Sequence, residues 1–255
     1  MTELDVFNFI IILMFILAMV VFLFLFFKPA PYDRYVRKGW GPVVNNTLGW
    51  IIMEVPASIM FTICFIVGDR KSLVPIIFLI MFNIHYIYRG FIFPFQMRGK
   101  TVMPLIIALS GATFNLINAY INARWIYTFS GNAYSDLWLI TPQFIFGFIL
   151  FYAGVGINLH SDHITRNLRK PGEKEMIWKI PYGGFHEYVA SPNYFGEITE
   201  WLGWAIITWS LPGLVFAVWT FANLAPRSNS HWKWYRTKFG DEYPQNRKRL
   251  IPFIW

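Results

Sequence analysis

The sequence predicts an all-α integral membrane protein with seven transmembrane helices, the N-terminus outside and the C-terminus in the cytoplasm. Of its 255 residues, 56% are hydrophobic and only 14% are charged, which is too little polar surface for a water-soluble fold. Several apolar runs reach the roughly 20 residues that a helix needs to cross the hydrocarbon core. No low-complexity or Pro/Gly/Ser-rich stretch divides the chain, so we expect a single domain over residues 1–255.

The first apolar run, residues 6–27, is preceded by Glu3 and Asp5. A cleavable signal peptide has basic residues there, so the run predicts a retained membrane helix. Further spans are expected at residues 48–67, 74–95, 102–123, 137–161, 194–210 and 212–228. The tight turn Trp209-Ser210-Leu211-Pro212 separates the last two, which predicts a helical hairpin.

Basic residues decide the orientation, because lysine and arginine accumulate on the cytoplasmic side of membrane proteins. With these spans, 18 of the 22 basic residues fall on one side, three fall on the other, and Arg89 lies inside the third span. The net charge of +8 therefore reports topology, and we do not expect a nucleic-acid partner. One cysteine, Cys64, excludes a disulfide framework and a cysteine metal site, and we expect no metal.

Glu54 lies in the second span, where an ionised carboxylate is costly and ionisable side chains often serve function. Burial favours the protonated carboxyl, which donates a hydrogen bond and suits an acid that holds a carbonyl oxygen. A structural hydrogen bond between helices is the alternative. In the third span, Tyr86 stands between His85 and Arg89, and we interpret it as functional, whereas Tyr88 is interpreted as a membrane-interface anchor.

Two polar stripes with helical spacing are predicted near the cytoplasmic surface. They comprise Asn158, Asp162, Arg166 and Arg169 at the end of the fifth span, and Arg227, His231 and Tyr235 after the seventh. Between them, Ser191-Pro192-Asn193 predicts a helix start that is followed by Glu197 and Glu200. Solvated helix faces and favourable first-turn charges are the alternatives.

Together the stripes predict a clamp for a polyanionic cofactor that carries ribose hydroxyls. Arginines suit phosphates, while carboxylates and amides suit hydroxyl and carboxamide groups. The chain has no P-loop, and no Gly-x-Gly-x-x-Gly follows a strand, which excludes a Rossmann site.

The order and number of several short motifs resemble the steroid 5α-reductase (3-oxo-5α-steroid 4-dehydrogenase) family along nearly the whole chain. The segments are Lys28-Pro29 with Tyr32, Glu54-Val55-Pro56, His85-Tyr86 with Arg89, residues 156–162, residues 168–173, Ile180-Pro181 with Gly183-Gly184, Asn193 followed by Gly196-Glu197-Ile198, Glu200-Trp201, residues 209–212 and the tail at 250–254. The resemblance implies a seven-helix reductase that uses NADPH to saturate the 4,5 double bond of a 3-oxo-Δ4 steroid.

Carried over residue by residue, the resemblance implies that Glu54 and Tyr86 hold the C3 carbonyl and that Trp50 lines the steroid pocket. The implied NADPH contacts are Asn158, Asp162, Arg169, Asn193, Glu197, Arg227, His231 and Tyr235, with Tyr32, Arg89, Arg98 and Arg166 as further contributors. Phe114 and Trp201 are expected to complete an apolar pocket for a substrate dissolved in the bilayer.

Three other functions are compatible with the residues alone. A membrane reductase of another enone or of an enoyl thioester would keep the cofactor residues and differ in the pocket. A membrane methyltransferase would bind S-adenosylmethionine, which lacks the phosphates that the arginines suit. A transporter or channel is disfavoured by the intramembrane Glu54 and by the lack of an internal repeat. We expect a multi-pass monomer among membrane lipids, in the endoplasmic reticulum of a eukaryote or the inner membrane of a bacterium.

Overall fold

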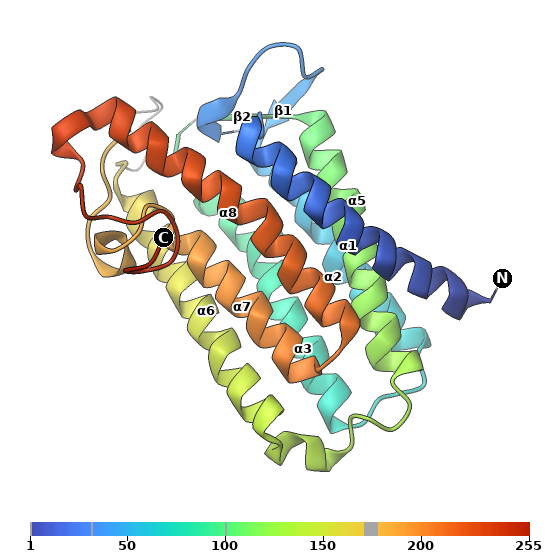
Figure 1. Cartoon of the computed structure of the whole chain (residues 1–255). Coiled ribbons are helices and arrows are strands. Elements are labelled where there is room, and N and C mark those ends of the chain that lie inside the picture. Colours follow the sequence, from blue (N-terminus) through green and yellow to red (C-terminus); the bar gives the residue numbers. More distant parts are fainter. Residues whose placement is uncertain (1, 32, 100, 171–177) are drawn as a thin grey trace. The chain divides into compact units, whose positions relative to one another are not determined.

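The computed structural model of the chain describes residues 2–31, 33–99, 101–170 and 178–255. In this part of the chain the secondary structure is almost entirely helical, which confirms the predicted all-α class (Figure 1). The chain forms two compact units. We call residues 2–30, 146–170 and 178–255 the terminal unit, because both ends of the chain belong to it, and residues 31, 33–99 and 101–145 the middle unit.

The terminal unit is built from α1 (Glu3–Phe27), most of α6 (Pro142–Asn167), α7 (Pro192–Thr208) and α8 (Leu211–Phe239). α1 and α7 both pack along α8 (Figure 1). α7 ends at Trp209, whose backbone is left-handed with φ 44°, and Ser210 then caps α8 by accepting a hydrogen bond from the Gly213 amide. The predicted helical hairpin is thereby confirmed.

Glycines let α6 and α7 approach each other closely. A Cβ atom placed on Gly154 would lie 2.5 Å from the carbonyl oxygen of Gly196, and one placed on Gly147 would lie 2.5 Å from the amide nitrogen of Ile207. Real Cβ atoms do not come this near to backbone, so only glycine fits at these crossings. The seam aligns the end of α6 with the start of α7, where the polar residues of both helices meet.

The middle unit contains α2 (Asn46–Val67), α3 (Leu73–Ile87), α4 (Phe93–Gln96) and α5 (Leu105–Arg124). α2 packs against both α3 and α5. The short strands β1 (Val43–Asn45) and β2 (Val102–Pro104) pair antiparallel and precede α2 and α5. Two π-helical turns, Tyr88–Ile92 and Trp125–Phe129, follow α3 and α5. Short 3-10 helices in the described residues are Asp33–Tyr35, Asp136–Ile140, Gly184–Glu187 and Gly240–Glu242.

The ends of the helices differ from the predicted spans in ways that have local causes. Residues 102–104 pair as β2 and are not helical. Residues 137–140 belong to a 3-10 turn, because Pro142 disfavours helix in the residue before it and Thr141 instead caps α6 by accepting from the Phe144 amide. α8 continues to Phe239, well beyond residue 228, and so carries Arg227, His231 and Tyr235 on one helix.

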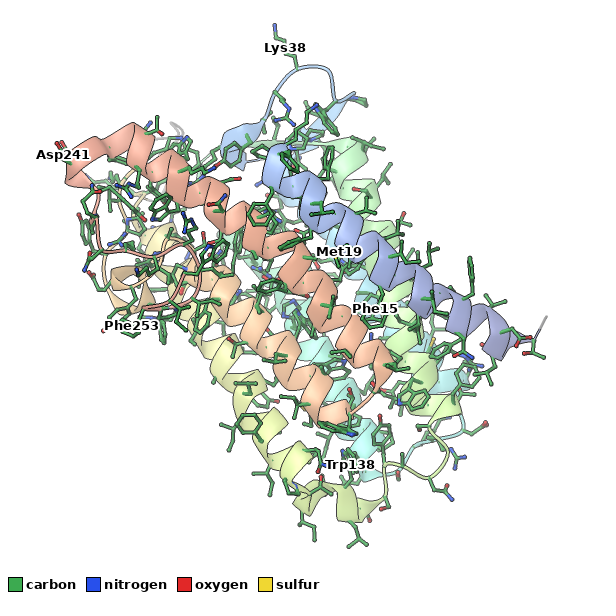
Figure 2. All side chains as sticks on the ribbon, viewed as in Figure 1. Phe15, Met19, Lys38, Trp138, Asp241 and Phe253 are labelled. Atoms are coloured by element: carbon green, nitrogen blue, oxygen red, sulfur yellow. The ribbon has the colours of Figure 1, made fainter. Side chains whose placement is uncertain are left out.

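Five helices of the described chain are long and apolar enough to cross a membrane: Glu3–Phe27, Asn46–Val67, Leu73–Gln96, Leu105–Phe129 and Pro142–Asn167. On α1 a narrow stripe that includes Phe7, Ile11 and Ala18 is buried, while Met19 is 63% exposed (Figure 2). A helix with apolar side chains on its exposed face suits lipid as its solvent. The helices therefore agree with a multi-pass membrane protein.

Candidate active site

Glu54 and Tyr86 come together in the middle unit through a third residue, Asn115. The three side chains lie on α2, α3 and α5 and are 9%, 2% and 6% exposed. The Tyr86 hydroxyl donates to Asn115 Oδ1 at 3.2 Å, and Asn115 Nδ2 donates to Glu54 Oε2 at 3.1 Å and to the Met53 carbonyl at 2.8 Å. The side-chain amide of Asn115 thus makes hydrogen bonds to both a carboxyl group and a phenol inside an apolar helix bundle.

This arrangement follows from the local sequence of each helix. Glu54 precedes Pro56, which has no amide hydrogen and so cannot donate to the Ile52 carbonyl within α2. Tyr86 sits in the last turn of α3, where its ring packs on Phe82 at 4.6 Å between centroids and on His85 at 5.0 Å. Its orientation is therefore fixed by rings on its own helix as well as by Asn115.

An aromatic and cationic cluster in the same unit contains Trp50 and Arg89. Arg89 is 5% exposed, and its guanidinium carbon lies 5.2 Å from the centre of the Trp50 ring and 4.9 Å from that of Phe93. Trp50 and Phe93 also meet edge to face, with centroids 5.0 Å apart. The structure thus brings Arg89, a predicted cofactor contact, to Trp50, a predicted substrate contact. Phe114, half-buried on α5, is adjacent in sequence to Asn115.

The terminal unit gathers four of the predicted cofactor residues at the end of the glycine seam. Asn158 Nδ2 donates to the Asn193 carbonyl at 3.0 Å and to Glu197 Oε2 at 3.5 Å, and Asn193 Nδ2 donates to Asp162 Oδ1 at 3.3 Å. Asn158 and Asp162 are 3% and 6% exposed. Amides and carboxylates on α6 and α7 therefore form one network, in which Asn193 and Glu197 are half-buried.

The predicted stripe on α8 meets the start of α7. Arg227 donates from Nη2 to the Tyr194 hydroxyl at 2.9 Å, and His231 Nδ1 lies 3.2 Å from Ser191 Oγ. The His231 ring packs on Tyr194 at 5.3 Å between centroids. Tyr235, 5% exposed, belongs instead to an aromatic stack, with its ring 5.3 Å from that of Tyr243 and an interplanar angle of 8°.

The structure describes all but one of the remaining predicted residues. Arg166 Nη2 lies 3.1 Å from His163 Nδ1, and Arg169 lies over the Trp178 ring at 5.2 Å. Trp201 is 1% exposed and packs on Phe216, with centroids 4.0 Å apart, in the core of the terminal unit. Arg98 is half-buried in the middle unit. Tyr32 lies outside the described residues.

Sequence reasoning missed Asn115 and Arg247. Asn115 had a readable signal, because asparagines at 115, 118 and 122 recur with helical spacing in an apolar run and all three are buried. Arg247, 1% exposed, donates from Nη1 to the Pro181 carbonyl at 3.1 Å and lies over the Tyr243 ring at 5.1 Å. Nothing in the sequence separates Arg247 from its basic neighbours Lys248 and Arg249.

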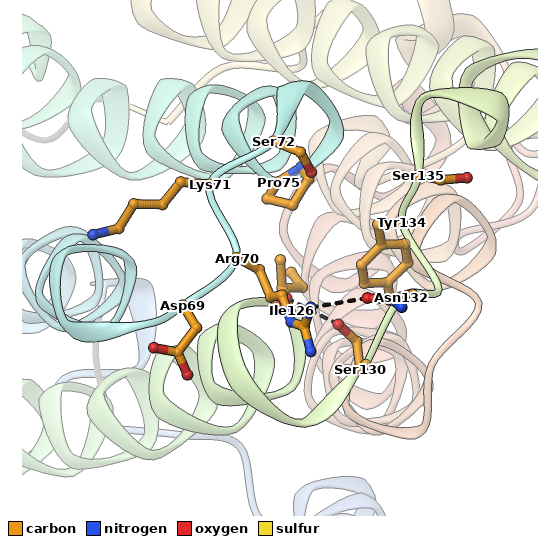
Figure 3. A pocket seen from close by; sticks show the side chains of 11 residues that line it. Asp69, Arg70, Lys71, Ser72, Pro75, Ile126, Ser130, Asn132, Tyr134 and Ser135 are labelled. Atoms are coloured by element: carbon orange, nitrogen blue, oxygen red, sulfur yellow. Dashed lines mark hydrogen bonds between the residues drawn. The ribbon is translucent and has the colours of Figure 1, made fainter.

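A cavity of about 350 Å³ opens elsewhere in the middle unit, between residues 69–75 and 126–135 (Figure 3). Arg70 points into it and donates to Asn132 Oδ1 at 2.9 Å, whereas Lys71 points away. None of the predicted catalytic, substrate or cofactor residues lines this cavity.

Comparison with known proteins identifies the family. The family model for 3-oxo-5-alpha-steroid 4-dehydrogenase matches residues 101–255. The chain belongs to this family. Steroid 5-alpha-reductase DET2 of Arabidopsis thaliana is 40% identical, over 90% of this chain and 89% of the relative. The 3-oxo-5-alpha-steroid 4-dehydrogenase 1 of Homo sapiens is 43% identical over 88% and 86%, and that of Bos taurus 40% over 93% of each chain.

Membership of the 3-oxo-5-alpha-steroid 4-dehydrogenase family confirms the resemblance seen in the sequence and makes this chain an enzyme, an oxidoreductase of steroid metabolism. The family model covers residues 101–255, which include Asn115 and the network of the terminal unit. The longer matches to the relatives take in most of the first half as well, where Glu54 and Tyr86 lie.

Proposed function

We propose that this protein reduces the 4,5 double bond of a 3-oxo-Δ4 steroid with NADPH and releases the 5α-dihydro steroid. Family membership supports the reaction class. The observation that carries the proposal is the buried carboxyl and phenol of Glu54 and Tyr86, joined by Asn115. No metal takes part, and the whole chain acts as a single reductase domain.

The carboxyl group of Glu54 and the hydroxyl group of Tyr86 donate hydrogen bonds to the carbonyl oxygen of the substrate. When C5 of the enone accepts hydride, negative charge moves onto the C3 oxygen, and hydrogen-bond donors already positioned there lower the barrier. Removing one such donor from other enzymes costs about 3–4 kcal/mol of transition-state stabilisation. Glu54, neutral in its apolar surroundings, and Tyr86 supply these donors. A proton then adds at C4, so that one hydride and one proton saturate the double bond.

When bound, NADPH would supply the hydride. The network of Asn158, Asp162, Asn193 and Glu197 fits the group, because it offers both donors and acceptors to ribose hydroxyls and a carboxamide. Arg227 adds a cation held by Tyr194, which suits a phosphate. His231 and Tyr235 follow along the same helix, and Arg166, Arg169, Arg89, Arg98 and Tyr32 are further proposed contacts.

The substrate reaches the protein through the bilayer. Trp50 presents an aromatic face beside Arg89, and Phe114 adds apolar surface for the flat steroid. We propose seven membrane spans, with α7 and α8 as the sixth and seventh, and a monomer with its N-terminus outside. Cysteine substitutions at Arg70 and Lys233, labelled with a membrane-impermeant maleimide in sealed vesicles, test this orientation. Labelling of both from one side would contradict it.

The reaction is tested by mass spectrometry of products after the purified protein is incubated with NADPH and progesterone. The wild type should form the 5α-dihydro steroid. Glu54→Gln should retain NADPH binding and lose turnover by about a hundredfold or more, because the glutamine amide is a much weaker hydrogen-bond donor than the protonated carboxyl that it replaces. Glu3→Gln, at the exposed start of α1, is the matched control and should keep wild-type turnover.

Two results would overturn parts of this proposal. Turnover of Glu54→Gln close to wild type would remove Glu54 from the mechanism. NADPH binding without any dihydro steroid would keep a reductase and discard the steroid, in favour of another enone or an enoyl thioester.

A further inference from the structure

We infer that Asn115 is a positioning residue that directs the protons of the two acidic groups, so that Glu54 is poised to donate to the substrate oxygen while Tyr86 is held in reserve. The inference rests on the proposed function, because it assigns an order to the two proposed donors. It adds a residue that neither the sequence motifs nor the comparisons point to.

The contacts fix which way round the Asn115 amide sits. Asn115 Nδ2 lies 2.8 Å from the Met53 carbonyl oxygen, and a backbone carbonyl can only accept a hydrogen bond. The NH2 end must therefore face Met53, and with it Glu54 Oε2 at 3.1 Å. Oδ1 must then face the Tyr86 hydroxyl at 3.2 Å. An exchange of the amide nitrogen and oxygen would set two acceptors against each other at Met53.

This orientation decides where the Tyr86 proton points. An amide oxygen can only accept, so the contact between Tyr86 and Asn115 requires the hydroxyl to be the donor. A tyrosine has a single hydroxyl hydrogen. While that hydrogen is directed at Asn115, Tyr86 can offer an incoming carbonyl only its lone pairs, and it donates to the substrate only after it turns away from Asn115.

The same amide acts in the opposite sense on Glu54. Asn115 donates to Oε2, which favours Oε2 as the carbonyl oxygen of the protonated carboxyl and leaves the acidic hydrogen on Oε1. Both Glu54 and Asn115 are at least nine-tenths buried, where an acceptor deprived of its donor is costly. Asn115 thereby holds Glu54 in the form that donates.

The test compares Asn115→Leu with Asn83→Leu. Asn83 is a suitable control because it also joins α2 and α3, through Ser58 and Thr62, and makes its third bond to the Leu79 carbonyl. Asn115→Leu should lower kcat about ten- to a hundredfold, as loss of supporting hydrogen bonds does at other sites. The steroid KM and the NADPH affinity should change less than about threefold. Asn83→Leu should keep kcat within about threefold of wild type.

A double-mutant cycle separates positioning from a merely structural role. In a Tyr86→Phe background the penalty of Asn115→Leu should grow, because no Tyr86 hydroxyl is then freed to donate to the substrate in place of Glu54. Equal penalties in the two backgrounds, or a kcat of Asn115→Leu that matches Asn83→Leu, would overturn the inference. Should Asn115→Leu not fold, Asn115→Ser removes the same bridge with a smaller change and should give the same loss of kcat and the same coupling.

Failure of the inference can be told from failure of the proposed function. Full turnover in Glu54→Gln would sink the proposed function and the inference with it. A Glu54→Gln protein without turnover, together with a fully active Asn115→Leu or Asn115→Ser protein, would keep the function and overturn only the role of Asn115.

Discussion

Replacing Gly154 by alanine tests the close approach of α6 and α7. The new Cβ atom would lie 2.5 Å from the Gly196 carbonyl oxygen, whereas ordinary contacts begin at 3.4 Å. Since both groups belong to helix backbones, the helices must separate locally by about 1 Å. Overpacking of this kind costs about 1–3 kcal/mol, which corresponds to a fall of about 2–12 °C in the melting temperature of a chain of this size.

Gly156→Ala is the matched control, because a Cβ atom at Gly156 meets nothing within 4 Å. It should leave the melting temperature unchanged or raise it slightly, since alanine favours helix more than glycine does. Thermal scans of tryptophan fluorescence in one detergent, at one heating rate, compare the two variants. Equal melting temperatures would refute the account of the seam. Gly154→Ala should also weaken NADPH binding, because Asn158 lies one turn further along α6.

Two further predictions concern the terminal unit. Burial lowers the pKa of His186 from 6.5 to about 4, so between these values the unfolded chain takes up a proton that the folded chain does not. The contribution of His186 to the free energy of unfolding is therefore complete above pH 6.5 and should fall by about 1.4 kcal/mol per pH unit down to about pH 4. Over this pH range the melting temperature of His186→Gln should fall less than that of the wild type. The melting temperature of the exposed control His163→Gln should fall as much as that of the wild type. Arg247→Ala should lower the melting temperature by several degrees, because it removes a buried side chain and its hydrogen bond to the Pro181 carbonyl. Lys248→Ala, at an exposed neighbour, should lower the melting temperature by less than about 1 °C. Equal effects of the two substitutions would contradict the structural role of Arg247.

The fold class and the helical hairpin could be predicted because apolar length and turn residues are local properties of the sequence. Glu54 and Tyr86 could be singled out as candidates for the same reason, because they are polar groups in apolar helices, and their role stays a prediction. β1 and β2 could not be predicted, since strands of three residues carry no periodic signal and exist only as a pair. The seventh span was expected to end near residue 228, because the chain beyond it is polar, and the helical spacing of Arg227, His231 and Tyr235 agrees with the continuation of α8 to Phe239.

Asn115 shows what the sequence leaves open within the site. A buried asparagine in an apolar run is compatible with many neighbours, and only the packing of α2, α3 and α5 selects Glu54, Met53 and Tyr86. The proposed cofactor residues were easier to group, since Asn158 and Asp162 share a helix face by their spacing alone. Their contacts with Asn193 could not be predicted, because they depend on how α7 packs against the glycines of α6. The sequence of α6 does not tell which residues of α7 lie opposite those glycines.

The π-helical turn after α3 has a consequence for insertions and deletions. In this turn the Phe93 amide bonds to the Tyr88 carbonyl, five residues back, so the turn holds one residue more than an α-helical turn does. Loss of one residue from the segment Tyr88–Ile92 would convert it to a regular turn and leave both flanks in phase. The same loss in the α-helix before it would rotate the flanks by about 100° and carry Tyr86 away from Asn115. A deletion of one residue should therefore be tolerated in the π-helical turn and should disrupt the site when it falls in the α-helix one turn earlier.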